Sequence, residues 1–179
     1  MTAVGSVYGE ALYSLAREEG LSQVILDELK VLDGCFAAEP GFIRLLSAPN
    51  LSKEERCRIL DDSFRGKVQP YVLNFLKILT EKGYMRHFSQ CVKAYRELYN
   101  QVGGILPVTA VTAVPMTDKQ VQALTMKLQS ITGKRIELMR KLDPNVLGGI
   151  RLDYDGKRVD DTVAHRMDAV RNMLKNTVL

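Results

Sequence analysis

Residues 88–115 read FSQCVKAYRELYNQVGGILPVTAVTAVP, and within this stretch a helical pattern gives way to a strand pattern. Apolar residues recur at the spacing of one helix face at Phe88, Cys91, Val92, Tyr95, Tyr99 and Val102. Gly103-Gly104 then ends the helix, and Val108 to Val114 (VTAVTAV) has the β-branched composition of a strand. The stretch therefore predicts a boundary between an all-helical domain at residues 1–104 and a small α+β domain at residues 105–179.

Toward the N-terminus, the first amphipathic segment carries an apolar stripe that ends before Gly20. The stripe repeats at i, i+3, i+4, i+7, i+8 and i+11, which predicts one helix with this face buried. Its members are Val4, Val7, Tyr8, Ala11, Leu12 and Leu15.

Four more helices are expected between this segment and residue 88. One follows Ser22 and ends before Pro40, and a short one spans Phe42 to Leu46. Another begins at a capping box, in which the Ser52 hydroxyl accepts from the Glu55 backbone N–H and the Glu55 carboxylate reaches back. The last begins at Pro70, a residue suited to the first turn. The N-terminal domain is thus predicted to be a compact six-helix bundle.

The C-terminal domain is predicted to contain both helices and strands. A second capping box, Thr117 to Gln120, opens a helix, and alternating apolar residues predict strands at 136–142, 146–154 and 157–159. Asp155-Gly156 is a strong signal for a two-residue hairpin turn. Asp160 to Thr162 supplies an N-cap for a terminal helix with a stripe of Val163, Met167, Val170 and Leu174. The order β-α-β-β-β-α gives an α+β fold class overall.

Composition places the chain among ordinary globular proteins. It has 179 residues, of which 46% are apolar and 26% are charged, with a formal net charge of +4. Residues 1–104 carry 13 basic and 13 acidic side chains, whereas residues 105–179 carry 12 and 8. The positive excess therefore lies in the C-terminal part of the chain, and this difference between the two segments is a first indication of two domains.

No targeting or spanning segment is evident in the sequence. The first twenty residues contain three Glu and lack a basic region before a continuous apolar stretch, unlike a signal or transit peptide. No window approaches 18 uninterrupted apolar residues. We expect any association with a membrane to occur only through partner proteins.

The sequence predicts neither a metal nor a cofactor. Cys35, Cys57 and Cys91 lack the spacing of a zinc site, and an odd number of cysteines suggests a reducing compartment. Aspartates near residue 155 do not follow the calcium-loop pattern, and turn formation and helix capping explain them. There is no phosphate-binding P-loop and no dinucleotide fingerprint around Gly148-Gly149.

Catalysis also lacks a recognisable set of residues. The only histidines, His87 and His165, are far apart in sequence, and neither accompanies a nucleophile elbow. A basic C-terminal domain is compatible with nucleic acid, but Tyr154 is the only aromatic residue after position 104, and single-stranded RNA recognition uses stacking aromatics. We therefore expect a non-catalytic protein that does not bind nucleic acid, with an RNA-binding helical regulatory factor as the alternative.

Several short motifs in a fixed order give the chain a resemblance to a known family. They are Tyr8 to Leu12 (YGEAL), Leu46 to Pro49 (LSAP), Asn74 to Gly83 (NFLKILTEKG), Asp143 to Ile150 (DPNVLGGI) and Asp155 to Val163 (DGKRVDDTV). Together they resemble the delta subunit of the F-type ATP synthase, a relative of the mitochondrial oligomycin-sensitivity-conferring protein. The structural motif residues of this pattern are Gly148, Gly149, Asp155, Gly156, Asp160 and Thr162. Gly9 and Thr162 depart from the family's usual Ala and Ser, and Gly9 is expected to weaken the first helix.

The resemblance implies a peripheral-stalk, or stator, subunit on the cytoplasmic face of the bacterial cell membrane. It implies that the first and fifth helices receive the N-terminal helix of an alpha subunit, and that the C-terminal domain holds the C-terminal region of subunit b. By motif, the candidate partner-binding residues are Tyr8, Ala11, Leu12, Asn74 and Ile78. Ala11 suits close approach of a helix because its side chain is small, whereas Tyr8 and Leu12 are equally explained as core residues.

Overall fold

The computed structural model describes residues 3–48, 50–146 and 148–161. The chain divides into two compact units, Met1–Tyr99 and Asn100–Leu179. The division falls inside the last helix before Gly103-Gly104, slightly earlier than the boundary that composition suggests. Helices come first and a sheet follows, which confirms the expected α+β class.

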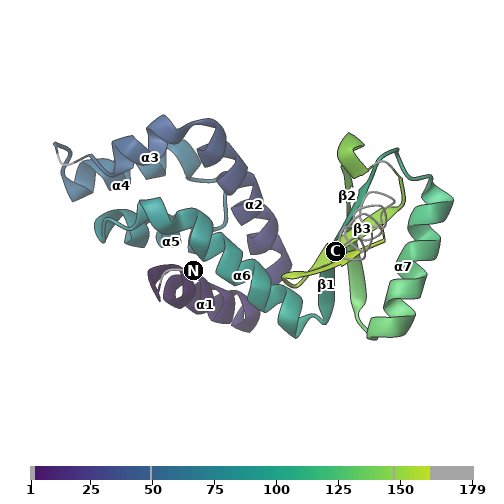
Figure 1. Ribbon diagram of the computed structural model, residues 1–179. Helices are drawn as coiled ribbons and strands as arrows, with labels where there is room; N and C mark the ends of the chain where they lie inside the picture. The colour runs from purple at the N-terminus through teal and green to yellow at the C-terminus, as the bar shows by residue number, and fades with distance from the viewer. Residues whose placement is uncertain (1–2, 49, 147, 162–179) are drawn as a thin grey trace, which may run out of the picture. The chain divides into compact units, whose positions relative to one another are not determined.

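The first unit is built from helices joined by short loops (Figure 1). Its helices are α1 (Ala3–Glu18), α2 (Ser22–Ala38), α3 (Pro40–Leu46), α4 (Lys53–Phe64) and α5 (Pro70–Glu81), followed by the 3₁₀ turn η1 (Met85–His87) and α6 (Phe88–Val102). Proline occupies the first position of α3 and of α5, where the missing N–H has no helical partner to lose.

The predicted capping box of α4 is present in full. The Glu55 backbone N–H donates to Ser52 Oγ over 3.1 Å, and the Ser52 backbone N–H donates to Glu55 Oε2 over 2.8 Å. The backbone hydrogen bond from Ser52 lowers the pKa of the Glu55 carboxyl, because it stabilises the charged form. This helix start is therefore fixed by four consecutive residues.

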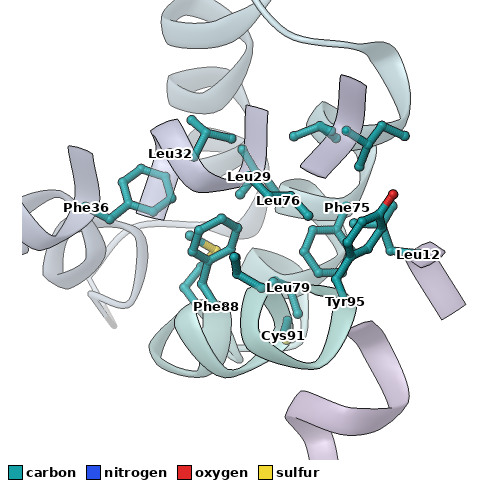
Figure 2. Close-up of a cluster of buried hydrophobic side chains, with 14 of the residues drawn as sticks. Leu12, Leu29, Leu32, Phe36, Phe75, Leu76, Leu79, Phe88, Cys91 and Tyr95 are labelled. Carbon is teal, nitrogen blue, oxygen red and sulfur yellow. The ribbon is translucent and has the colours of Figure 1, made fainter. Parts of the chain in front are cut away.

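The core of the first unit consists mainly of leucine and aromatic side chains, most of them from α1, α2, α5 and α6 (Figure 2). Phe36 lies near the C-terminal end of α2. The centroid of its ring is 5.0 Å from that of Phe88 and 5.6 Å from that of Phe42. The fully buried residues include Ile25, Leu29, Leu76, Leu79, Phe88 and Tyr95. Since burial of each such side chain contributes about 1.5–3 kcal/mol, this cluster supplies most of the driving force for folding of the unit.

Helix α1 does not bury the face that its apolar stripe predicts. The buried positions are Gly5, Gly9, Leu12, Tyr13 and Ala16. Of the predicted stripe only Leu12 is buried, while Val7 is 62% exposed and Leu15 is 37% exposed. The reason is close approach, since a Cβ at Gly5 would stand 2.8 Å from the Cβ of Gln90 on α6. The helix turns Gly5, Gly9 and Ala16 toward the core together with Leu12 and Tyr13, and it leaves Val7 and Leu15 exposed.

The second unit contains a four-stranded mixed sheet and one described α-helix. Its elements are β1 (Ile105–Thr112), α7 (Asp118–Thr132), β2 (Arg135–Leu142), the 3₁₀ turn η2 (Pro144–Val146), β3 (Ile150–Tyr154) and β4 (Lys157–Asp160). The strand order is β2-β1-β3-β4. β1 pairs with β2 in parallel and with β3 in antiparallel orientation. A parallel pair needs a crossover, which α7 provides.

Helix α7 begins and ends as the sequence predicts. The Gln120 backbone N–H donates to Thr117 Oγ1 over 3.4 Å, and the Thr117 backbone N–H donates to Gln120 Oε1 over 2.8 Å. Gly133 follows the last turn with φ of 66°, the left-handed conformation that glycine adopts at low cost. Figure 1 shows α7 lying beside the sheet.

The hairpin prediction is confirmed, whereas the predicted strand at 146–154 is too long. Asp155 and Gly156, with φ of 48° and 70°, connect the paired residues Tyr154 and Lys157. β3 begins only at Ile150, because Gly148 and Gly149 have φ of 145° and 83°, which a strand does not contain. Asp160 ends β4 and pairs with Arg151 across the sheet. Thr162 and the predicted terminal helix lie outside the described residues.

Candidate partner-binding surface

Helices α1 and α5 are joined by contacts at both of their ends. Near the start of α1, the Tyr8 ring meets the Tyr84 ring, just after α5, edge to face with centroids 5.8 Å apart. Near the end of α1, the Tyr71 hydroxyl of α5 donates a hydrogen bond to the Glu19 carboxylate, which raises the pKa of Tyr71. The start of one helix thus lies beside the end of the other.

An exposed apolar surface runs along this pair of helices. We define the α1–α5 face by Val4, Val7, Ala11 and Leu15 of α1 together with Asn74 and Ile78 of α5. Ala11 and Asn74 are exposed, and Ile78 is 45% exposed. The four α1 residues follow the helical spacing i, i+3, i+7 and i+11, so they form one continuous stripe. Large apolar side chains left in water at this spacing are typical of a partner-binding surface.

The five candidate residues from the sequence fall into two groups. Ala11, Asn74 and Ile78 are on the surface. Tyr8 is half-buried against Tyr84, and Leu12 is only 5% exposed and belongs to the core. Leu12 therefore lies in the core beneath the α1–α5 face, while Tyr8 remains partly accessible at its edge.

The α1–α5 face rests on a rigid base. Tyr13 of α1 packs edge to face against Tyr95 of α6, with ring centroids 5.4 Å apart. The Tyr95 hydroxyl donates to the backbone carbonyl of Ser22 over 2.9 Å, which ties α6 to the start of α2. Burial raises the pKa of the Tyr95 hydroxyl, so it stays a neutral donor at all physiological pH values. A preformed surface of this kind loses little conformational entropy when a helix docks on it.

Charged side chains lie at both ends of the α1–α5 face. Glu18 and Glu19 stand at the end of α1, and the Glu19 carboxylate accepts a hydrogen bond from Tyr71 at the start of α5. Lys82 and Arg86 are exposed in the segment that follows α5, on either side of the Tyr84 that meets Tyr8. One end of the surface thus carries two carboxylates beside Arg17, and the other carries two cations beside the exposed Glu81.

Sequence reasoning missed Val7 and Leu15 as surface residues, since it counted them as core. A usable signal was present in the spacing of Gly5 and Gly9, two small residues one turn apart. Small residues at i and i+4 let the backbones of two helices approach closely. The pair marks the buried side of α1 and so leaves the larger apolar residues for the solvent side.

The second unit offers a cavity but no predicted contact residues for a partner. The cavity has a volume of about 390 Å³ and lies where the end of β1, the start of α7 and the start of β3 meet. The walls include Pro115, Met116, Leu124 and Ile150. The motif residues Gly148, Gly149, Asp155 and Gly156 all have positive φ, and the last two form the turn between β3 and β4.

The described part of the chain has neither a cluster of metal ligands nor a membrane-spanning helix. Within residues 3–48, 50–146 and 148–161, no three His, Cys, Asp or Glu side chains come together as metal ligands. None of the helices in these ranges has the length and apolar composition needed to cross a membrane.

Comparison with known proteins identifies the family. The model of the family "ATP synthase delta (OSCP) subunit" matches residues 4–174. The chain belongs to this family. Its motifs from Tyr8 to Val163 lie within the matched range, so the resemblance seen in the sequence is confirmed.

Relatives in this family match the chain from end to end. The ATP synthase subunit delta of Alkaliphilus oremlandii is 31% identical over 98% of both chains, and that of Clostridioides difficile is 28% identical over 99% of both. A chain in the structure of the Toxoplasma gondii mitochondrial ATP synthase hexamer superimposes with a TM-score of 0.74 at 16% identity, covering 97% of this chain and 98% of that one. That likeness shows the same fold. None of these comparisons supports the alternative of an RNA-binding regulatory factor.

Proposed function

We propose that this member of the delta (OSCP) family is a non-catalytic stator subunit of an F-type, proton-translocating ATP synthase. It links the catalytic head, through the N-terminal helix of an alpha subunit, to subunit b of the peripheral stalk. The single observation that carries the proposal is the exposed apolar α1–α5 face on a rigid helical unit. Family membership names the complex, and this surface supplies a place for one partner to bind.

The α1–α5 face suits an amphipathic helix. Apolar residues at i, i+3, i+7 and i+11 offer the anchors that a second helix uses when its own apolar side packs across them. Ala11 lies in the middle of the stripe, so a partner helix can come close there. We assign Tyr8, Ala11, Asn74 and Ile78 to direct contact, with Leu12 beneath them.

The two domains, residues 1–104 and 105–179, take different partners in this proposal. The helical domain has balanced charge, whereas the C-terminal domain carries 12 basic and 8 acidic side chains. A basic surface steers an acidic or mixed-charge partner segment into place. We therefore assign the C-terminal domain to the C-terminal region of subunit b.

The role is mechanical, because the stator must hold the head while the rotor turns. A dissociation constant of about 1 nM with an association rate of about 10⁶ M⁻¹s⁻¹ gives a residence time of roughly a thousand seconds. A complex with this residence time stays bound through many catalytic turnovers of the ATP synthase. In this proposal the subunit lies at the cytoplasmic face of the bacterial membrane and is held there only by its neighbours in the complex.

Titration calorimetry tests the alpha-subunit contact. The full-length protein is titrated with a synthetic peptide of the alpha-subunit N-terminal helix from the same organism. We expect tight binding that Ala11→Arg weakens by about a hundredfold or more, since a long charged side chain in the stripe keeps the helices apart. Ala37→Arg, at an exposed alanine of α2, is the matched control and should bind as the parent does. A parent protein that gives no binding heat would overturn the proposal.

A further inference from the structure

The acidic end of the α1–α5 face continues the apolar stripe. Glu18 follows Leu15 by three residues and Ala11 by seven, so it lies on the same side of α1. Glu19 is next in the chain, held by Tyr71 of α5. A helix that covers Ala11 and Leu15 must therefore pass over or beside these two carboxylates.

Nothing within α1 explains why acidic residues stand at this position. The C-terminal end of a helix carries a partial negative charge, which disfavours Glu and favours Lys or Arg. Arg17 follows that preference but lies on another side of the helix. Among the described residues, no ion pair joins Glu18 to a cation. The carboxylate of Glu18 is thus exposed, costly to its own helix and adjacent to a docking surface.

The opposite end of the α1–α5 face carries two exposed cations, which outnumber the single carboxylate of Glu81 there. Lys82 and Arg86 flank Tyr84, whose ring packs on Tyr8 at the start of α1. A partner helix laid along the face therefore meets carboxylates at one end and cations at the other. This separation of negative from positive side chains along the face can select both the partner helix and the direction in which that helix lies.

Building on the proposed function, we propose that the helix bound at the α1–α5 face carries basic side chains at one end of its apolar stripe, and that these side chains pair with Glu18 and Glu19. Glu18 is then a specificity-determining residue, because a helix with acidic residues at that end is repelled. The apolar stripe supplies most of the affinity, and the carboxylates fix the orientation of the partner.

The test measures binding of the fluorescein-labelled alpha-subunit N-terminal peptide to the full-length protein by anisotropy and stopped flow. Glu18→Lys should raise the dissociation constant about three- to tenfold at about 50 mM salt, mostly through slower association, and the difference should shrink at about 500 mM salt. Glu10→Lys makes the same charge change on another side of α1 and should alter binding less than about twofold. A peptide in which Glu replaces its Lys and Arg residues should prefer Glu18→Lys over the parent.

The outcomes separate this inference from the proposed function. If the parent binds the peptide and Glu18→Lys binds it equally well at low salt, the charge inference is wrong while the docking surface stands. If the parent does not bind the peptide at all, the proposed function fails first. If the parent protein sediments as a dimer that Ala11→Arg dissociates, the face is covered by a second copy of the chain, and both ideas are overturned.

Discussion

Gly9 of α1 lies directly against the backbone of Cys91 on α6. A Cβ at Gly9 would stand 2.6 Å from the Cys91 carbonyl oxygen and 2.8 Å from the Cβ of Ala94. Judged by sequence, Gly9 only weakens α1, because glycine is a poor helix former. The structure shows that its missing side chain instead permits the close contact between α1 and α6.

Gly9→Ala should therefore destabilise the protein although alanine favours helices. The forced separation of α1 and α6 costs about 1–3 kcal/mol, which exceeds the gain of about 1 kcal/mol in helix propensity. Urea unfolding followed by circular dichroism measures the change. Gly34→Ala is the control, since Gly34 lies inside α2 with nothing near its would-be Cβ, and it should stabilise by about 0.5–1 kcal/mol. If Gly9→Ala stabilised the protein as Gly34→Ala does, the close contact between α1 and α6 would be contradicted.

Glu28 should matter for stability through the start of α5. Its Oε2 accepts a hydrogen bond of 2.9 Å from the Gln69 backbone N–H, at the N-cap position of α5. Glu28→Ala removes this acceptor and should lower the free energy of unfolding by about 1–2 kcal/mol, as loss of a helix cap does. Glu28→Gln keeps an acceptor and should cost less. Chemical denaturation of both variants measures the difference, and equal effects would show that the hydrogen bond is unimportant.

The ion pair between α4 and α5 should give stability that depends on pH. Lys77 Nζ lies 2.7 Å from Asp61 Oδ1, and the hydrogen bond from Lys77 lowers the pKa of the Asp61 carboxyl below its ordinary value of 3.8. Because the folded pKa is the lower one, the pair stabilises the fold above pH 3.8 and is lost as the pH falls through the folded pKa.

Asp61→Asn should consequently destabilise the protein more at pH 7 than at pH 3. Urea midpoints at the two pH values measure this difference. Asp62→Asn, at the exposed neighbouring position, should show a smaller dependence and serves as the control. An Asp61→Asn effect that is the same at both pH values would contradict the stabilising role of the pair.

The three cysteines should react at very different rates. Cys35 is exposed, Cys57 is half-buried and Cys91 is buried. Burial raises the pKa of the Cys91 thiol to about 11, so at pH 8 only roughly one molecule in a thousand carries the reactive thiolate there. Burial and the neighbouring Glu81 also raise the pKa of Cys57. A thiol reagent should label Cys35 first, and all three only in urea; fast labelling of Cys91 in the folded protein would show that α6 opens readily.

Local features were predictable from the sequence because the interactions that create them span few residues. The capping boxes at Ser52 and Thr117 and the hairpin at Asp155-Gly156 each involve backbone groups within four positions. The change from helices to strands near Gly103-Gly104 followed from periodicity and composition alone. The candidate residues Ala11, Asn74 and Ile78 came from motif resemblance, and the structure places all three on the surface.

Tertiary packing decided what periodicity left ambiguous. Helix α1 has two plausible buried sides, an apolar one with Val7 and Leu15 and a small one with Gly5 and Gly9. Only the shape of α6 selects the small side, because close backbone approach gives more contact than larger side chains would allow at greater distance. The same choice leaves Val7 and Leu15 exposed beside α5. The sequence determined that α1 is an amphipathic helix, and the tertiary structure determined which of its sides is available for a partner.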